Sequence, residues 1–259
     1  MKCFITGNTI IMCIINLIKS ISKRRINRLI KKTSDGVEYI WLRHHSDTLI
    51  IVFSGIGNAR FNYLRTLKDC KCDQLYIRDC WAGGVSYYWY EKKSNHPETY
   101  TDNLIASILK EKRYNEIVTV GSSKGGTAAI YYGLKIKANL IYAGACQYKV
   151  GDYLSRHQFI EHPEQWNAVV GDDITDEWVN ILDNKVSDVI KQNRGCPTKI
   201  KLLYSVKEHT YDDHIKPLLN QIEACGIQHE DQVEEFPEHS MIGDYFKRAL
   251  YQYFIEGNR

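Results

Sequence analysis

The sequence predicts an α/β protein with a mostly parallel, doubly wound sheet. Apolar runs without alternation, such as Thr48–Phe53 (TLIIVF), are typical of strands buried on both faces of a parallel sheet. Runs of this kind alternate with segments that carry apolar residues at helical spacing, which favours parallel crossovers. A G-x-S-x-G pattern at residues 121–125 lies between a β-branched run and a small-residue helical run, and it indicates a sharp strand-to-helix turn.

The expected strands follow from runs rich in β-branched, aromatic and other apolar residues. In chain order they are residues 37–42, Thr48–Phe53, 74–77, 116–120, 139–143, Lys199–Tyr204 and 232–236. The run that ends at Phe53 is followed by a glycine-bearing loop, Ser54-Gly55-Ile56-Gly57. An aromatic and glycine-rich loop, residues 78–92, follows the third strand.

The expected helices lie between these strands. They are residues 59–67, 102–112, 127–134, 214–224 and Ile242–Phe254. Residues 102–112 have apolar residues at helical spacing, and residues 127–134 begin with small side chains that let a helix lie close to the sheet. Residues 150–195 mix aromatic and many charged side chains, so we expect a helical insertion there, after the strand at residues 139–143.

Length and composition limit the class of protein. A chain of 259 residues with 44% hydrophobic content can build one sizeable core, and we expect a single domain over residues 36–259. The net charge of +3 is too small to indicate nucleic acid as a partner. Eight cysteines show no C-x-x-C, framework or zinc-finger spacing, which favours reduced thiols in the cytoplasm and no metal site.

Residues 1–35 form an apolar and basic segment outside this domain. Residues 9–18 are nearly all apolar, but a bilayer span needs about 20 residues. Residues 19–32 are basic and follow the apolar run, whereas the charge of a signal peptide precedes it. Two interpretations stay open, a packed or partly disordered helix and an amphipathic segment on an anionic membrane surface.

The pattern at residues 121–125 predicts a nucleophile elbow. So sharp a turn leaves no room for side chains two residues before and after the turning residue, which explains Gly121 and Gly125. Ser123 would then be presented as a nucleophile at a helix N-terminus. The alternatives are a glycine-rich turn without chemistry and a phosphate-binding loop, although Lys124 precedes the glycine pair here, unlike in a Walker loop.

Acid and base candidates follow later strands, in the order serine, acid, histidine that such an elbow requires. His239 comes directly after the last expected strand, and as a neutral imidazole it could accept the Ser123 proton. Glu208 follows the preceding strand soonest and is the expected acid, with Asp212 as the alternative. His209 and His214 share the loop of the acid, so we expect local hydrogen bonding or substrate contacts from them.

Backbone amides are expected to form an oxyanion hole. One belongs to Lys124, after the nucleophile, and the other to Ile56 in the glycine-bearing loop. The Lys124 side chain is expected to point outward. In the aromatic loop, Trp81 and Tyr88 are candidates for stacking on sugar faces, although such aromatic side chains are equally often ordinary core.

Six stretches carry a resemblance to a known family. They are FSGIGN (53–58), RDCWAGGVSYYW (78–89), VGSSKGG (120–126), ACQYKVGDYL (145–154), YSVKEHTYDDH (204–214) and PEHSM (237–241). In their order and spacing the chain from about residue 48 onward resembles bacterial α/β-hydrolase-like proteins of capsular polysaccharide biosynthesis. That family includes serine-dependent polysaccharide O-acetyltransferases. Accessory proteins of an adhesin-export system look similar.

The resemblance implies an α/β-hydrolase-like fold and an acyl-enzyme on Ser123. It also implies acetyl-CoA as the donor substrate, with no bound cofactor, and a polysaccharide hydroxyl as the acceptor. The family's acid matches Glu208 by position in its loop. A cytoplasmic protein at the inner face of the membrane, associated peripherally with the capsule machinery, would fit this role. Two other functions stay open, a carbohydrate esterase or deacetylase with the same residues and a non-catalytic scaffold of a capsule or secretion complex.

Overall fold

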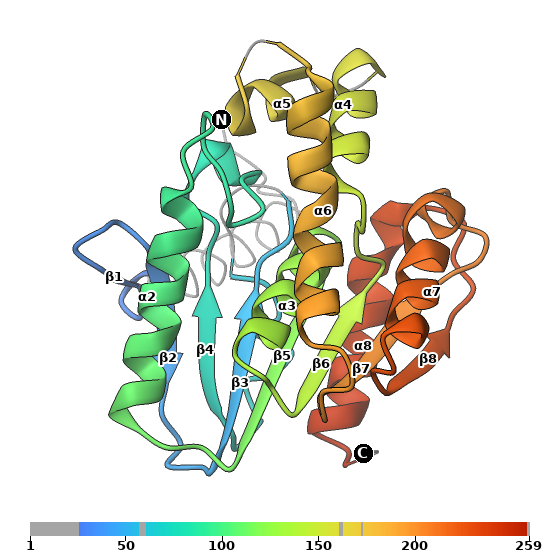
Figure 1. The fold of residues 1–259 in the computed structure, drawn as a ribbon. Coiled ribbons are helices and arrows are strands. Elements are labelled where there is room, and N and C mark those ends of the chain that lie inside the picture. The colour runs from blue at the N-terminus through green and yellow to red at the C-terminus, as the bar shows by residue number, and fades with distance from the viewer. Residues whose placement is uncertain (1–25, 57–60, 161–162, 172, 258–259) are drawn as a thin grey trace, which may run out of the picture.

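A computed structural model describes residues 26–56, 61–160, 163–171 and 173–257. Residues 1–25, which hold most of the N-terminal apolar and basic segment, lie outside this description. The described chain forms one eight-stranded sheet with helices on both faces (Figure 1). This is the α/β architecture that the sequence predicts.

The strands pair in the spatial order β1-β2-β4-β3-β5-β6-β7-β8. Their bounds are β1 Lys31–Lys32, β2 Glu38–Leu42, β3 Thr48–Phe53, β4 Asp73–Ile77, β5 Glu116–Ser122, β6 Leu140–Gly144, β7 Lys199–Tyr204 and β8 His229–Val233. From β4 to β8 every neighbouring pair is parallel, whereas β1 and β2 add an antiparallel edge. The sheet therefore begins at Lys31, before the expected domain start at residue 36.

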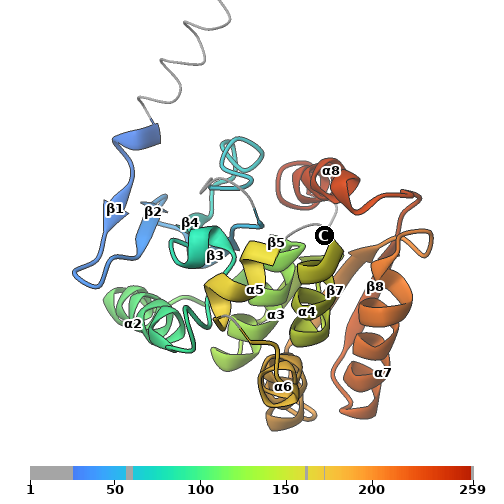
Figure 2. The ribbon, with the colours of Figure 1, turned by 90° about the horizontal axis from the view of Figure 1, so that it is seen from above.

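Helices cover the two faces of the sheet unequally (Figure 2). The helices are α2 His96–Glu111, α3 Lys124–Lys135, α4 Val150–Ile160, α5 Pro163–Val169, α6 Asp176–Gln192, α7 Lys216–Ala224 and α8 Ile242–Phe254. One face carries α2, α3, α6 and α7, and the other carries α8. Helices α4 and α5, in the region expected to be an insertion, stand above the carboxyl ends of the strands (Figure 1). None of the helices in the described ranges has the length and apolar character that a membrane span needs.

Three expected elements differ clearly from the structure. The helix expected at residues 102–112 already begins at His96. The helix expected at residues 59–67 is a series of turns over residues 62–69, where Tyr63 has a φ of 60° that a right-handed helix cannot contain. The last strand is His229–Val233 rather than residues 232–236. It is the edge strand of the sheet and half-exposed, so its sequence HEDQV is polar and lacks the apolar signal of a central strand.

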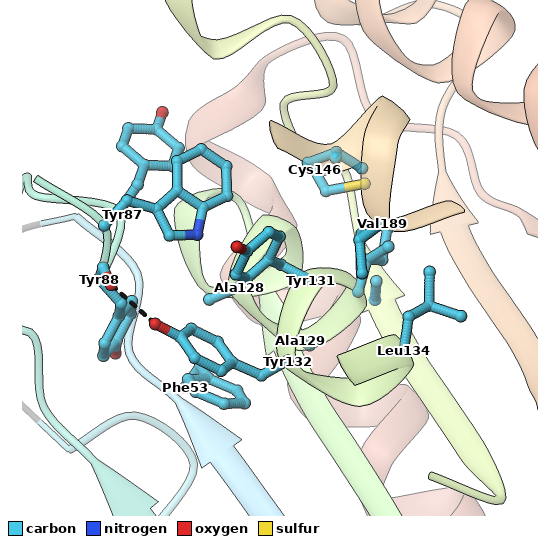
Figure 3. Close-up of a cluster of buried hydrophobic side chains, with 14 of the residues drawn as sticks. Phe53, Tyr87, Tyr88, Ala128, Ala129, Tyr131, Tyr132, Leu134, Cys146 and Val189 are labelled. Atoms are coloured by element: carbon cyan, nitrogen blue, oxygen red, sulfur yellow. Dashed lines mark hydrogen bonds between the residues drawn. The ribbon is translucent and has the colours of Figure 1, made fainter. Parts of the chain in front are cut away.

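The aromatic loop is packed into the core on the α3 side of the sheet (Figure 3). The ring of Phe53, at the end of β3, stacks on Tyr132 with centroids 5.2 Å apart and meets Tyr88 edge-on at 5.3 Å. The Tyr132 hydroxyl donates a hydrogen bond of 2.7 Å to the backbone oxygen of Tyr88. These contacts hold the loop after β4 against α3, next to the turn that carries Ser123.

Candidate active site

Ser123 occupies a strained turn between β5 and α3. Its φ of 53° and ψ of −131° lie in a region that L residues rarely adopt, so the surrounding structure must hold it there. Its N–H donates to Gly144 O of the neighbouring strand at 2.8 Å, and its backbone oxygen accepts from Gly126 N at 2.8 Å. The strand-to-helix turn is thus anchored on both sides of the serine.

The two glycines of the pattern are required by close backbone packing. A Cβ atom at Gly121 would lie 2.1 Å from Gly125 O, and one at Gly125 would lie 2.5 Å from Phe53 O. Real Cβ atoms do not approach backbone atoms this closely, and neither contact is to a flexible side chain. Only glycine fits at these two positions, so both glycines are needed for the turn that exposes the Ser123 side chain, as the pattern predicts.

Three side chains from the segments that follow β5, β7 and β8 are joined by hydrogen bonds. Contrary to expectation, His239 does not directly follow the last strand, because β8 ends at Val233 and His239 begins the short helical turn His239–Met241. Ser123 Oγ lies 2.8 Å from His239 Nε2, and His239 Nδ1 lies 2.8 Å from Glu208 Oε1. A carboxylate can only accept, so His239 donates through Nδ1–H and accepts the Ser123 hydroxyl proton through Nε2. The imidazole is thus held in the tautomer that a general base for Ser123 needs.

Glu208 is placed to stay ionised. Its side chain is buried, and burial by itself would raise its pKa. The hydrogen bond and charge of His239, with a 2.6 Å hydrogen bond from Thr210 Oγ1, outweigh burial and bring the pKa below its ordinary value. An ionised Glu208 would stabilise the imidazolium that forms when His239 accepts a proton.

The alternative acid lies elsewhere. The Asp212 side chain is 81% exposed and its nearest ion pair is with Lys216, at 3.9 Å within the same helical segment. Asp213 pairs with Arg156 at 2.9 Å. The structure therefore brings Glu208, and not Asp212, against His239.

The two other histidines of this loop have different surroundings. His209 Nδ1 lies 3.5 Å from Glu208 Oε1, and its ring is 5.9 Å from that of His239. His214 is buried, and its Nδ1 accepts a hydrogen bond from Lys149 N at 3.3 Å. Burial lowers the pKa of His214 to about 4, against the raising influence of Asp213 and Asp152.

We expect His214 to make the protein less stable in mild acid. The unfolded chain binds a proton on this histidine near pH 6.5 and the folded chain only near pH 4, so stability is lost as pH falls between these values. From pH 7 to pH 5 the loss from this group is about 2 kcal/mol. Urea unfolding at both pH values should show a smaller loss for His214→Gln than for the wild type. Equal losses would contradict this assignment.

The candidate oxyanion loop lies beside the elbow. A Cβ atom at Gly55 would be 3.4 Å from Ser122 O, which brings the residues after β3 into contact with the strand that ends at the serine. Lys124 is the first residue of α3, where backbone N–H groups have no partner within the helix and the helix dipole is positive. The structure thus places Ile56 and Lys124 on segments that flank Ser123.

The Lys124 side chain is buried, so the expectation that it points outward was wrong. It is 0% exposed, and Nζ donates to Asp79 Oδ2 at 2.6 Å. Nζ also lies 4.7 Å from the ring centroid of Tyr88. Burial lowers the pKa of Lys124, while Asp79 raises it. Asp79, in the loop that follows β4, supplies a buried counter-charge that sequence spacing does not reveal.

Trp81 and Tyr88 are core side chains rather than exposed stacking platforms. Tyr88 is 0% exposed, and its hydroxyl accepts from Ser54 N at 2.7 Å and donates to Ile77 O at 3.0 Å. Trp81 is 8% exposed and meets the His96 ring edge-on. In this arrangement Tyr88 is closed to a substrate, and its hydrogen bond holds Ser54 at the start of the candidate oxyanion loop.

Gln147 also lies at the candidate active site, although the sequence did not predict it there. Its Nε2 lies 3.3 Å from Ser123 Oγ and 3.3 Å from His239 Nε2. It follows β6, and the carboxyl ends of parallel strands are where sites form, so that rule could have identified it. Among the described residues no group of histidine, cysteine, aspartate or glutamate side chains is arranged to hold a metal ion.

The protein has an α/β-hydrolase-like fold. This follows from the order of the strands, from the elbow after β5, and from the positions of Glu208 and His239 after β7 and β8. No family model matches the chain, and no curated protein matches it significantly. Solved structures do match it at the level of the fold.

The chain is similar to the capsule O-acetyltransferase of Neisseria meningitidis serogroup A, with a TM-score of 0.71 and 16% identity over 88% of this chain and 93% of that one. A histidine-to-alanine variant of that enzyme, solved in complex with CoA, matches with a TM-score of 0.66 and 16% identity over 85% and 94%. A glycosylation associate protein complex of Streptococcus agalactiae matches with a TM-score of 0.68 and 17% identity over 88% of this chain and 46% of that one. A ferulic acid esterase matches with a TM-score of 0.59 and 11% identity over 87% and 94%.

Proposed function

We propose that this protein is an O-acetyltransferase that moves an acetyl group from acetyl-CoA to a hydroxyl of a bacterial capsular polysaccharide. The observation that carries the proposal is the hydrogen-bonded chain Ser123–His239–Glu208 on a strained elbow. The fold likeness to a capsule O-acetyltransferase with a CoA-bound variant supports the choice of donor and acceptor. The likeness to an esterase supports the covalent serine chemistry that both classes share.

In the first half-reaction Ser123 Oγ attacks the thioester carbonyl of acetyl-CoA. His239 Nε2 takes the hydroxyl proton, and Glu208 stabilises the resulting imidazolium. The backbone N–H groups of Ile56 and Lys124 would hold the oxyanion of the tetrahedral intermediate. The carbon–sulfur bond then breaks, His239 returns the proton to the departing CoA sulfur, and the acetyl group stays on Ser123.

In the second half-reaction a hydroxyl of the acceptor gives its proton to His239 and attacks the acetyl carbon. The bond from Ser123 Oγ to that carbon breaks, and Oγ regains the proton from His239. If water takes the place of the acceptor, the same residues perform an esterase reaction. A cytoplasmic location and peripheral contact with the membrane-bound capsule machinery belong to this proposal as well.

Intact-protein mass spectrometry after brief mixing with acetyl-CoA tests the proposal. We expect one added acetyl group on the wild type and none on Ser123→Ala. Free CoA should be measured in the same samples, because a rapidly hydrolysed intermediate releases CoA without accumulating. Neither adduct nor CoA release from the wild type would contradict the acetyl-CoA reaction. Acetate release from an acetylated glycan, without transfer from acetyl-CoA, would favour the esterase.

Substitution of the acid should separate Glu208 from Asp212. Glu208→Gln removes the charge that holds the His239 tautomer, and we expect turnover to fall by about 10³- to 10⁴-fold. Asp212→Asn is the matched control, since its exposed side chain contacts Lys216 and should change turnover by about twofold at most. Rates of CoA release from acetyl-CoA measure both. The reverse ranking would transfer the role of the acid to Asp212.

A further inference from the structure

The side chain of Gln147 is buried and fixed by the surrounding structure. It is 1% exposed, and the Tyr87 hydroxyl donates to its Oε1 at 3.4 Å. Its backbone is joined to the first turn of α3, because Thr127 Oγ1 accepts from Gln147 N at 3.0 Å and donates to Gln147 O at 2.8 Å. Since Tyr87 occupies the amide oxygen, the amide nitrogen faces the site as a donor.

The amide nitrogen of Gln147 lies close to both the candidate nucleophile and the candidate base. Nε2 of Gln147 lies 3.3 Å from the nucleophile oxygen, Ser123 Oγ, and 3.3 Å from the base nitrogen, His239 Nε2. Any oxygen that resolves an acyl-enzyme on Ser123 must reach His239 Nε2 at hydrogen-bond distance and the acyl carbon on Ser123 Oγ at about 3–3.5 Å. A donor close to both atoms therefore borders the space that the incoming oxygen enters. An oxyanion donor, in contrast, faces the carbonyl oxygen and has no need to contact the base.

We propose that the Gln147 side-chain amide holds the hydroxyl group that resolves the Ser123 acyl-enzyme. This inference rests on the proposed function. The amide N–H donates to a lone pair of the incoming oxygen, while His239 Nε2 takes that oxygen's proton. The oxygen bonds to the acetyl carbon, the Ser123 Oγ bond to that carbon breaks, and Oγ receives the proton from His239. Gln147 thereby acts mainly on the second half-reaction, and Tyr87 is a positioning residue that orients the amide.

Burst kinetics with p-nitrophenyl acetate test this assignment, because its leaving group departs without needing a proton. The burst reports acylation of Ser123 and the following steady rate reports deacylation, measured in water and with added glycerol as an alcohol acceptor. For Gln147→Met we expect deacylation to slow by about 10- to 100-fold, acylation to slow by less, and the share of acetyl passed to glycerol to fall. Tyr87→Phe should produce a smaller change of the same kind.

Two matched variants separate this role from a loss of folding. Tyr132→Phe removes the hydroxyl of another buried tyrosine of the same cluster, a hydroxyl that donates to Tyr88 O (Figure 3). This substitution should leave the ratio of deacylation to acylation unchanged. Gln74→Met removes a buried amide remote from Ser123, bonded to Leu67 O and Cys70 O, and should also leave the ratio unchanged. Equal slowing of both steps in Gln147→Met, or no change in either, would overturn the inference. No burst from the wild type, together with no CoA release from acetyl-CoA, would instead overturn the proposed function.

Discussion

Ser123→Ala and His239→Ala are each expected to reduce turnover by about 10⁴- to 10⁶-fold, because each removes a member of a unit that works only when complete. Without the Ser123 hydroxyl no covalent intermediate forms. Without His239 the hydroxyl has no base at 2.8 Å to take its proton. CoA release from acetyl-CoA, measured at saturating donor, checks both variants.

The double variant Ser123→Ala/His239→Ala provides the sharper check. Residues that act as a unit are strongly non-additive, so the double variant should be no slower than either single one. Circular dichroism and urea unfolding should show that all three fold like the wild type. Turnover near the wild-type rate in His239→Ala would remove this histidine from the mechanism. If the loss in the double variant equals the product of the losses in the two single variants, the two residues act independently.

Lys124→Met is expected to lower the free energy of unfolding by about 3–5 kcal/mol. The substitution leaves Asp79 buried and charged without its cation, while Asp79 keeps its hydrogen bonds from Ser86 Oγ at 2.6 Å and Trp81 N at 3.2 Å. Leaving one buried charge without a partner destabilises the folded protein more than replacing both charges of the pair does. Urea unfolding at neutral pH measures the loss.

A second substitution distinguishes the buried charge from simple loss of packing. Lys124→Met/Asp79→Asn keeps an amide able to accept from Ser86 and Trp81 N but removes the uncompensated charge, so most of the stability should return. Lys191→Met is the control, since its pair with Asp188 is more than half exposed and should contribute less than about 1 kcal/mol. If the double variant is as unstable as Lys124→Met, the buried charge is not the cause of the loss.

Local sequence predicted the central strands of the sheet well, but it misplaced the edge strand that precedes His239. The continuous apolar run Thr48–Phe53 has the predicted bounds because a strand buried on both faces leaves an unbroken hydrophobic signal. The polar edge strand His229–Val233 was misplaced because half-exposed strands lack that signal. Likewise, Tyr63 has a left-handed backbone conformation, which a right-handed helix cannot contain. The local sequence pattern does not predict this conformation.

Local sequence patterns predict the alternation of strands and helices, the glycine-flanked turn at Ser123 and the positions of Glu208 and His239 after later strands. These features are local, set by periodicity and by the space that a tight turn permits. The packing of the folded chain brings Glu208 rather than Asp212 against His239, and it turns Lys124 and Gln147 inward. Those outcomes depend on which strand ends become neighbours in the sheet. Ser123 and His239 are 116 residues apart along the chain and meet only because β5, β6, β7 and β8 lie side by side.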